Sequence, residues 1–223
     1  AGYDISGHNS PPLHLSGCVY VYIDRGGCRL GLVIADVSGK GTSAALISAM
    51  CRAVMRTLAP QHPSPATALS RLNRQLFPDI REDMFITMAY LVLDAESGQV
   101  TYCRAGHTDP MIWRAATGHV ESLSIPGMAV GIDRGDVFER LARDTTITLE
   151  PGDTLLLYTD GISEATDSKE LKFDENRIER SLALRGPQGP ASVVQGLLQE
   201  LDVFCGGRQS LDDITLIAVQ KSP

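Results

Sequence analysis

Residues 31–58 read GLVIADVSGKGTSAALISAMCRAVMRTL, and this stretch decides the fold that the sequence predicts. The apolar run LVIA at 32–35 is typical of a strand buried on both faces, and Asp36 stands where we expect that strand to end. Glycines on either side of Lys40 favour a sharp turn. Beyond it, apolar residues recur at helical spacing over 42–58. An ordinary strand–turn–helix connection fits this pattern. A binding site also fits it, in which the Asp36 carboxylate binds a cation and the start of the helix binds an anion that accompanies the cation.

Composition excludes several classes of protein. The chain has 223 residues with 43% apolar side chains, enough for a substantial core, and its net charge of −7 argues against binding to nucleic acids or anionic membranes. We find no membrane-span or signal-peptide pattern. The five cysteines are odd in number and scattered, as expected for reduced thiols of a cytoplasmic protein. We expect residues 1–223 to form one domain, and the first residue, Ala1, suggests that it was excised from a longer signalling protein.

The order of the elements predicts an α+β fold of two packed antiparallel sheets with helices outside them. Residues 1–12 read as an extended leading segment. Periodicity, turn residues and the Ser64-Pro65 helix start predict the remaining elements. We expect strands at 13–23, 28–35, 84–93, 100–105, 137–149, 154–158 and 214–219, a short hairpin within 110–123, and helices at 42–58, 65–77, 174–184 and 191–204.

Three aspartates occupy similar positions relative to predicted strands. Asp36 and Asp160 each end an apolar strand, and Asp212 precedes another. Carboxylates at strand ends can converge at the rim of a sheet, and Mg²⁺ and Mn²⁺ prefer such oxygen ligands. Three ordinary turn aspartates would show the same spacing, so the pattern alone leaves both interpretations open.

Four segments together resemble the SpoIIE/RsbU branch of the PPM (PP2C-like) protein phosphatases. They are IADVSGKGTSAAL at 34–46, AGHTDP at 105–110, PGDTLLLYTDGISEA at 151–165 and DDITLIAV at 212–219, in the order of that family. The resemblance implies a four-layer αββα sandwich and Mn²⁺- or Mg²⁺-dependent hydrolysis of phosphoserine or phosphothreonine. It also implies that the catalytic carboxylates Asp36, Asp160 and Asp212 hold the metal pair, that Asp36 bridges it, and that the Val37 carbonyl contributes. A metal-activated water is then the nucleophile.

The first strand departs from the pattern of that family. Where the family carries a Gly-Asp-aromatic motif, this chain reads SGCVYV at 16–21, so Cys18 replaces a metal-binding Asp and Val21 replaces the last Asp of the motif. A thiol is a poor ligand for a hard cation, and its usual pKa of about 8.5 leaves it mostly protonated at pH 7. We therefore expect at least one bound cation, a weakened second site, and impaired or absent hydrolysis.

Two functions follow from the resemblance. In the first, the domain is a phosphatase whose substrate is a STAS-type anti-sigma-factor antagonist. In the second, it is a pseudophosphatase, such as the C-terminal output domain of an RssB-type response regulator, that binds a sigma factor or an anti-sigma-factor antagonist without hydrolysis. Cys18 favours the second function, and the intact motifs around Asp36, Asp160 and Asp212 favour the first. A second copy of the chain is a further candidate partner.

Overall fold

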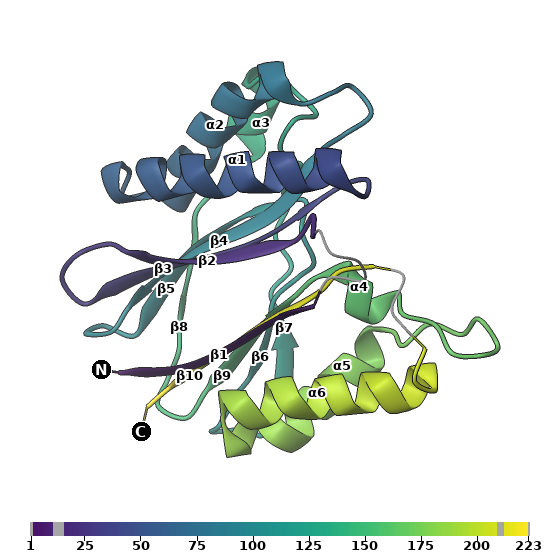
Figure 1. Cartoon of the computed structure of the whole chain (residues 1–223). Coiled ribbons are helices and arrows are strands. Elements are labelled where there is room, and N and C mark those ends of the chain that lie inside the picture. Colours follow the sequence, from purple (N-terminus) through teal and green to yellow (C-terminus); the bar gives the residue numbers. More distant parts are fainter. Residues whose placement is uncertain (1, 11–15, 209–211, 223) are drawn as a thin grey trace. The chain divides into compact units, whose positions relative to one another are not determined.

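The computed structural model describes residues 2–10, 16–208 and 212–222. Its elements belong to two compact units, each with a five-stranded antiparallel sheet of its own (Figure 1). The α1–α3 unit comprises Leu15–His107 and Ile125–Thr148, and the α4–α6 unit comprises Ala1–His14, Thr108–Ser124 and Leu149–Pro223. The predicted fold class, α+β with two antiparallel sheets and helices, is confirmed.

The sheet of the α1–α3 unit has the strand order β2-β3-β4-β5-β8. Helices α1 and α2 lie along one face of this sheet (Figure 1). The bounds are β2 Val19–Asp24, β3 Arg29–Val37, α1 Thr42–Leu58, α2 Pro65–Leu76, β4 Ile86–Asp94, β5 Gln99–Ala105, α3 Asp136–Leu141 and β8 Thr145–Thr148, with short 3-10 turns at Ala59–Gln61 and Phe77–Asp79.

The segment at 31–58 forms the strand, turn and helix that its sequence predicts. In β3, Val33, Ala35 and Val37 point to the same side and join the core that α1 and α2 cover. Gly39 and Gly41 take positive φ angles of 90° and 78° in the connection to α1.

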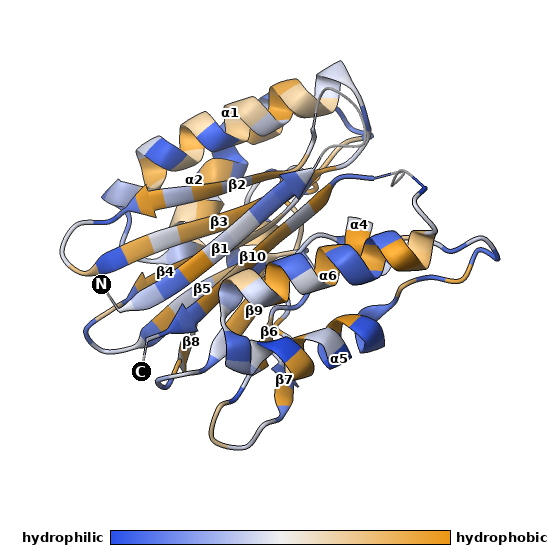
Figure 2. Cartoon of the chain, turned by 60° about the horizontal axis from the view of Figure 1, so that its bottom comes forward, coloured by the Kyte–Doolittle hydropathy of each residue, from blue (hydrophilic) through white to orange (hydrophobic). Residues whose placement is uncertain are grey.

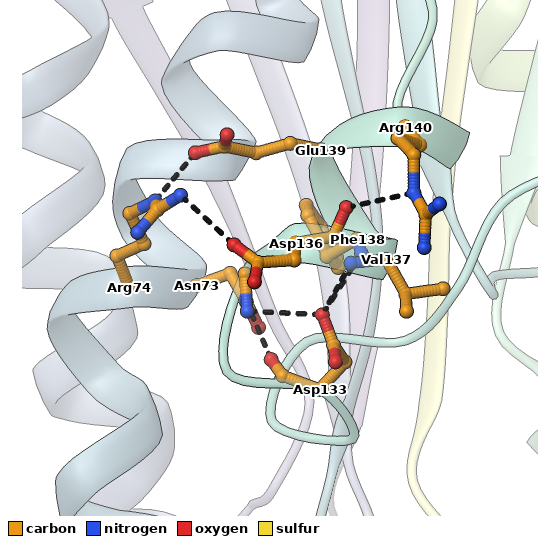
Figure 3. A network of polar contacts seen from close by, with 9 residues as sticks. Asn73, Arg74, Asp133, Asp136, Val137, Phe138, Glu139 and Arg140 are labelled. Atoms are coloured by element: carbon orange, nitrogen blue, oxygen red, sulfur yellow. Dashed lines mark hydrogen bonds and ion pairs between the residues drawn. The ribbon is translucent and has the colours of Figure 1, made fainter.

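A polar network holds α3 against α2 (Figure 3). Asn73 of α2 is fully buried; its Nδ2 donates to the carbonyl of Asp133 at 2.9 Å, and its Oδ1 accepts from Gly131 N–H at 2.9 Å. The Asp133 carboxylate in turn accepts from the N–H groups of Val137 and Phe138 at the start of α3. These hydrogen bonds thereby fix α2 to the loop before α3, which lies far from α2 in the sequence.

The sheet of the α4–α6 unit has the strand order β1-β10-β9-β6-β7. Helices α5 and α6 lie against this sheet, and apolar side chains of both helices share a core with β6, β9 and β10. Figure 2 shows that α6 carries both hydrophobic and hydrophilic residues. The bounds are β1 Tyr3–Ser10, β6 Met111–Trp113, β7 Val120–Ser122, β9 Thr154–Tyr158, α4 Asp160–Ser163, α5 Glu175–Arg185, a 3-10 turn Gly186–Gln188, α6 Pro190–Cys205 and β10 Ile214–Lys221.

One buried carboxylate ties the β6–β7 hairpin to the turn before β9. Asp153 is 2% exposed and accepts from Arg114 Nη1 at 2.8 Å, Ala115 N–H at 2.8 Å and Glu150 N–H at 3.1 Å. Arg114 also pairs with the more exposed Glu121 at 2.9 Å. The hairpin predicted within 110–123 is confirmed, and Asp153 fixes the start of its turn.

Two element predictions need correction. The leading segment at 1–12 contains a strand, β1, which pairs with β10 over its whole length, from Tyr3–Lys221 to Ser10–Ile214. The strand predicted at 137–149 is instead the helix α3 followed by the short strand β8. Of the strand predicted at 13–23, residues 13–15 lie outside the described ranges, and β2 begins at Val19.

Candidate functional site

Asp36 lies within β3, one residue before the end of the strand. It is half-buried and pairs with Thr87 of β4. Beyond it, Val37 is buried, Ser38 N–H donates to the Phe85 carbonyl at 2.9 Å, and Phe85 N–H donates to Ser38 Oγ at 2.8 Å. These bonds carry the β3–β4 pairing past Asp36, so the carboxylate projects from fixed backbone.

Cys18 is the neighbour of Asp36 across the sheet. The β2–β3 register pairs Val19 with Ala35, so Cys18, directly before β2, and Asp36, in β3, are the next residues beyond that pair. Cys18 is 3% exposed, and its backbone is held by Ser16, whose Oγ accepts from Cys18 N–H at 3.1 Å and donates to the Cys18 carbonyl at 2.9 Å. A thiol therefore stands beside Asp36, where a carboxylate would be a better metal ligand.

Val21 occupies a different environment from Cys18. It is 2% exposed and lies in the apolar core shared with α1 and α2. Since side chains alternate along a strand, Val21 points to the face opposite to that of Cys18. Of the two, Cys18 is therefore the residue on the face of the sheet opposite to the core under α1 and α2.

Asp160 and Asp212 come together in the α4–α6 unit. Asp160 is the first residue of α4, directly after β9, and Asp212 precedes β10, the neighbour of β9 in the sheet. Both are exposed. A Cβ added to Gly161 would lie 3.5 Å from Asp212 Cβ and only 2.2 Å from the Asp213 carbonyl, so this close approach requires glycine.

A buried threonine fixes the backbone beside these two aspartates. Thr159 Oγ1 donates to the Asp213 carbonyl at 3.1 Å and accepts from Thr215 N–H at 3.0 Å, while Thr159 N–H donates to the Thr215 carbonyl at 3.0 Å. Asp213 N–H donates to Asp212 Oδ1 at 2.9 Å. Asp160 follows Thr159, and Asp212 precedes Asp213. The backbone at these two aspartates is thus held in one relative position.

The donor atoms suit a hard cation. Asp36, Asp160 and Asp212 offer carboxylate oxygens, and Val37 offers a carbonyl, whereas the Cys18 thiol does not suit Mg²⁺ or Mn²⁺. The structure brings Asp160 and Asp212 together and places Asp36 beside Cys18 in the α1–α3 unit. Within the described parts of the chain, no group of three His, Cys, Asp or Glu side chains gathers closely enough to hold a metal ion.

Sequence reasoning missed Thr87 as a part of this region. Thr87 pairs with Asp36, and its Oγ1 hydrogen-bonds with His107 Nδ1 at 3.0 Å. His107 is 2% exposed, and its carbonyl accepts from Arg104 Nε. The buried histidine of the AGHTDP motif thus supports the strand next to Asp36. The motif is a signal for His107, whereas Thr87 has no signal in the sequence.

Comparisons with known proteins agree with the motifs. The family model described as Stage II sporulation protein E (SpoIIE) matches residues 26–222. The phosphoserine phosphatase RsbU of Bacillus subtilis is 28% identical over 221 residues, which cover 98% of this chain. This chain spans only 63% of the length of RsbU.

Solved structures show the same fold. The PP2C phosphatase domain of SpoIIE from Bacillus subtilis, with a fragment of its regulatory domain, gives a TM-score of 0.82 at 19% identity and covers 98% of this chain and 63% of that one. The catalytic domain of the serine/threonine protein phosphatase PstP, in complex with two manganese ions, gives a TM-score of 0.71 at 15% identity and covers 100% of this chain and 99% of that one. The fold is therefore PP2C-like. Within the described ranges, no helix has the length and hydropathy needed to cross a membrane.

Proposed function

Because the chain belongs to the SpoIIE family, we propose that it is the PP2C-like phosphatase domain of a bacterial signalling protein, with hydrolysis of phosphoserine or phosphothreonine impaired by Cys18. The observation that carries the proposal is the β2–β3 register, which puts a buried thiol next to Asp36. RsbU is named as a phosphoserine phosphatase, and this supports the reaction class.

The proposed metal ligands are the carboxylates of Asp36, Asp160 and Asp212 and the carbonyl of Val37. Bound Mn²⁺ or Mg²⁺ would lower the pKa of a coordinated water and neutralise negative charge on a phosphoryl group. The chain itself contributes rigid positioning: Thr159 holds the backbone next to Asp160 and Asp212, and the β3–β4 pairing holds Asp36. Since Cys18 adds no negative charge beside Asp36, a second cation would bind more weakly.

The proposed substrate is a phosphorylated regulatory protein of the bacterial cytoplasm. A STAS-type anti-sigma-factor antagonist is the first candidate because of the likeness to RsbU. Cys18 also supports a second candidate function, a pseudophosphatase output domain of a response regulator that binds a sigma factor or its antagonist. The two functions differ in one measurable property, turnover in the presence of Mn²⁺.

Turnover of a phosphoserine peptide with Mn²⁺ tests the proposal. We expect slow hydrolysis by the wild-type chain and at least about tenfold faster hydrolysis by Cys18→Asp, since even indirect changes around a metal alter activity by that factor. Adding Asp160→Asn to Cys18→Asp should abolish the gain. Cys18→Ser is the matched control, because it removes the thiol without adding a carboxylate, and it should leave the rate low.

Two results would contradict this account. Rapid wild-type turnover, unchanged by Cys18→Asp, would show that Cys18 does not limit catalysis. Failure of every variant to hydrolyse the peptide or to bind Mn²⁺ in calorimetry would leave only the pseudophosphatase function. Val21→Asp is unsuitable as a further gain-of-function change, because it would bury a charge in the core under α1 and α2.

A further inference from the structure

A groove of about 540 Å³ lies between α5 and α6 in the α4–α6 unit, apart from every proposed metal ligand. Both views of the chain show the two helices side by side (Figures 1 and 2). Two aromatic rings line the groove: Phe173, which is 2% exposed, and Phe204 pack edge to face with ring centroids 5.3 Å apart. Val203 stands at the edge of the groove and is 74% exposed.

The charged residues of this groove, which we call the α5–α6 groove, are mostly arginines. Arg177, Arg180 and Arg185 line it together with the acidic residue Glu200. The Arg177 guanidinium carbon lies 4.7 Å from the centroid of the Phe204 ring. This cation–π contact holds the charge over an apolar surface.

The arginines have two different roles. Arg185 Nη1 contacts Glu200 Oε1 at 2.5 Å and Ser181 Oγ at 3.0 Å, so its charge is already paired within the groove wall. Gly196 of α6 makes room for it, since a Cβ there would lie 1.8 Å from Arg185 Nε. Arg177 and Arg180 are exposed, and neither forms an ion pair with another residue of the described ranges.

We propose that the α5–α6 groove is a docking site for an acidic amphipathic helix of a partner protein. Charge complementarity supports this occupant: the whole chain has a net charge of −7, yet the groove has two arginines available for carboxylates. Phe204, which is partly exposed, and Val203 offer apolar surface for the anchors of such a helix, and the buried Phe173 supports the Phe204 ring from below. Aromatic and arginine residues are also the types enriched at the centres of protein interfaces.

A partner protein fits this site better than a membrane surface does. The negative charge of the chain outside the groove would repel an anionic bilayer. A single helix would contact only the groove and would avoid this repulsion. The inference goes beyond the proposed function, because neither Asp36, Asp160 nor Asp212 lines the groove. Loss of docking and loss of hydrolysis can therefore be measured separately.

The test measures fluorescence anisotropy of a labelled synthetic peptide that presents leucines on one face of a helix and glutamates on the other. We expect the wild-type chain to bind it, and Arg177→Glu with Arg180→Glu to weaken binding at least about tenfold. Arg52→Glu with Arg56→Glu is the matched control, since it makes the same charge change on the exposed side of α1 and should bind as the wild type does. Val203→Asp should weaken binding without a change in the arginines.

Thermal unfolding of each variant verifies that it is folded. Absence of peptide binding by the wild type would overturn the proposal, as would equal binding by the α5 double variant and its control. Equal binding of a peptide with serines in place of the leucines would show charge attraction alone and would overturn it too. Binding to anionic phosphatidylglycerol vesicles without binding to the peptide would assign the groove to a membrane and refute the docking site.

Discussion

At the scale of single residues, the position of Cys18 has the largest consequence for function. Its backbone is fixed by Ser16, and its register next to Asp36 follows from the β2–β3 pairing. Cys18→Asp would therefore place an oxygen ligand beside Asp36 without a change of backbone. The sequence allowed the substitution to be recognised, and the structure adds that Val21 belongs to the apolar core instead.

Asp153 offers a residue-scale prediction about stability. Asp153→Ala should lower the free energy of unfolding by about 3 kcal/mol or more, because it leaves Arg114 partly buried without its innermost partner and two backbone N–H groups without an acceptor. Urea unfolding followed by circular dichroism measures this loss.

Glu121→Ala is the matched control for Asp153→Ala. It removes the more exposed partner of the same Arg114, whose Nε lies 2.9 Å from Glu121, and should cost less than about 1 kcal/mol. Equal losses for the two variants would show that burial of Asp153 does not set the strength of its interactions.

At the scale of elements, the sequence predicted most helices and strands because apolar periodicity and turn residues marked them. β1 escaped because its residues are mostly polar or glycine and only half-buried, and long-range pairing with β10 makes it a strand. The start of α3 escaped because Val137 and Phe138 favour strands locally, whereas the Asp133 carboxylate accepts their N–H groups and fixes a helix there. Tertiary contacts overrode local preference in both cases.

The network between α2 and α3 gives a prediction at this scale. Asn73→Ala should lower the free energy of unfolding by about 2 kcal/mol, because the Asp133 carbonyl and Gly131 N–H both lose their partner. Urea unfolding provides the measurement. Gln75→Ala, on the exposed side of the same helix, is the control and should change the stability by less than about 0.5 kcal/mol. An unchanged free energy of unfolding in Asn73→Ala would show that these hydrogen bonds do not stabilise the fold.

At the scale of the whole molecule, the sequence motifs identified the candidate metal ligands, and contacts that the sequence does not show position them. Thr159 and Gly161 flank Asp160 in the YTDG motif, yet their role depends on β10 lying beside β9. Thr87 could not be recognised because its link to Asp36 arises from strand pairing. The candidate ligands could be chosen from the sequence, whereas the residues that position them could be found only from the fold.

Three turn aspartates make a global prediction about pH. Hydrogen bonds from the backbone N–H groups of Ser97, Phe138 and Leu171 lower the pKa of Asp94, Asp133 and Asp167, respectively. A pKa that is lower in the folded state stabilises the fold above the unfolded pKa of about 3.9, and this stabilisation is lost as the pH falls through the folded pKa. We expect the melting temperature to decline below about pH 4.

A variant with all three aspartates changed to Asn tests the origin of this decline. Asn keeps an oxygen acceptor but does not titrate in this range, so the melting temperature of the variant should depend less on pH between about 5 and 3 than that of the wild type. Calorimetric melts across this range provide the measurement. Identical pH profiles for the two proteins would exclude these aspartates as the source.

The five cysteines differ in accessibility: Cys28 is exposed and the other four are buried. A maleimide dye should therefore attach at a single point, the connection between β2 and β3, without any engineered thiol. The hydrogen bond to Glu96 raises the pKa of Cys28, so conjugation should be slow at neutral pH and accelerate under mildly alkaline conditions. The unmodified chain thus provides its own handle for single-molecule spectroscopy.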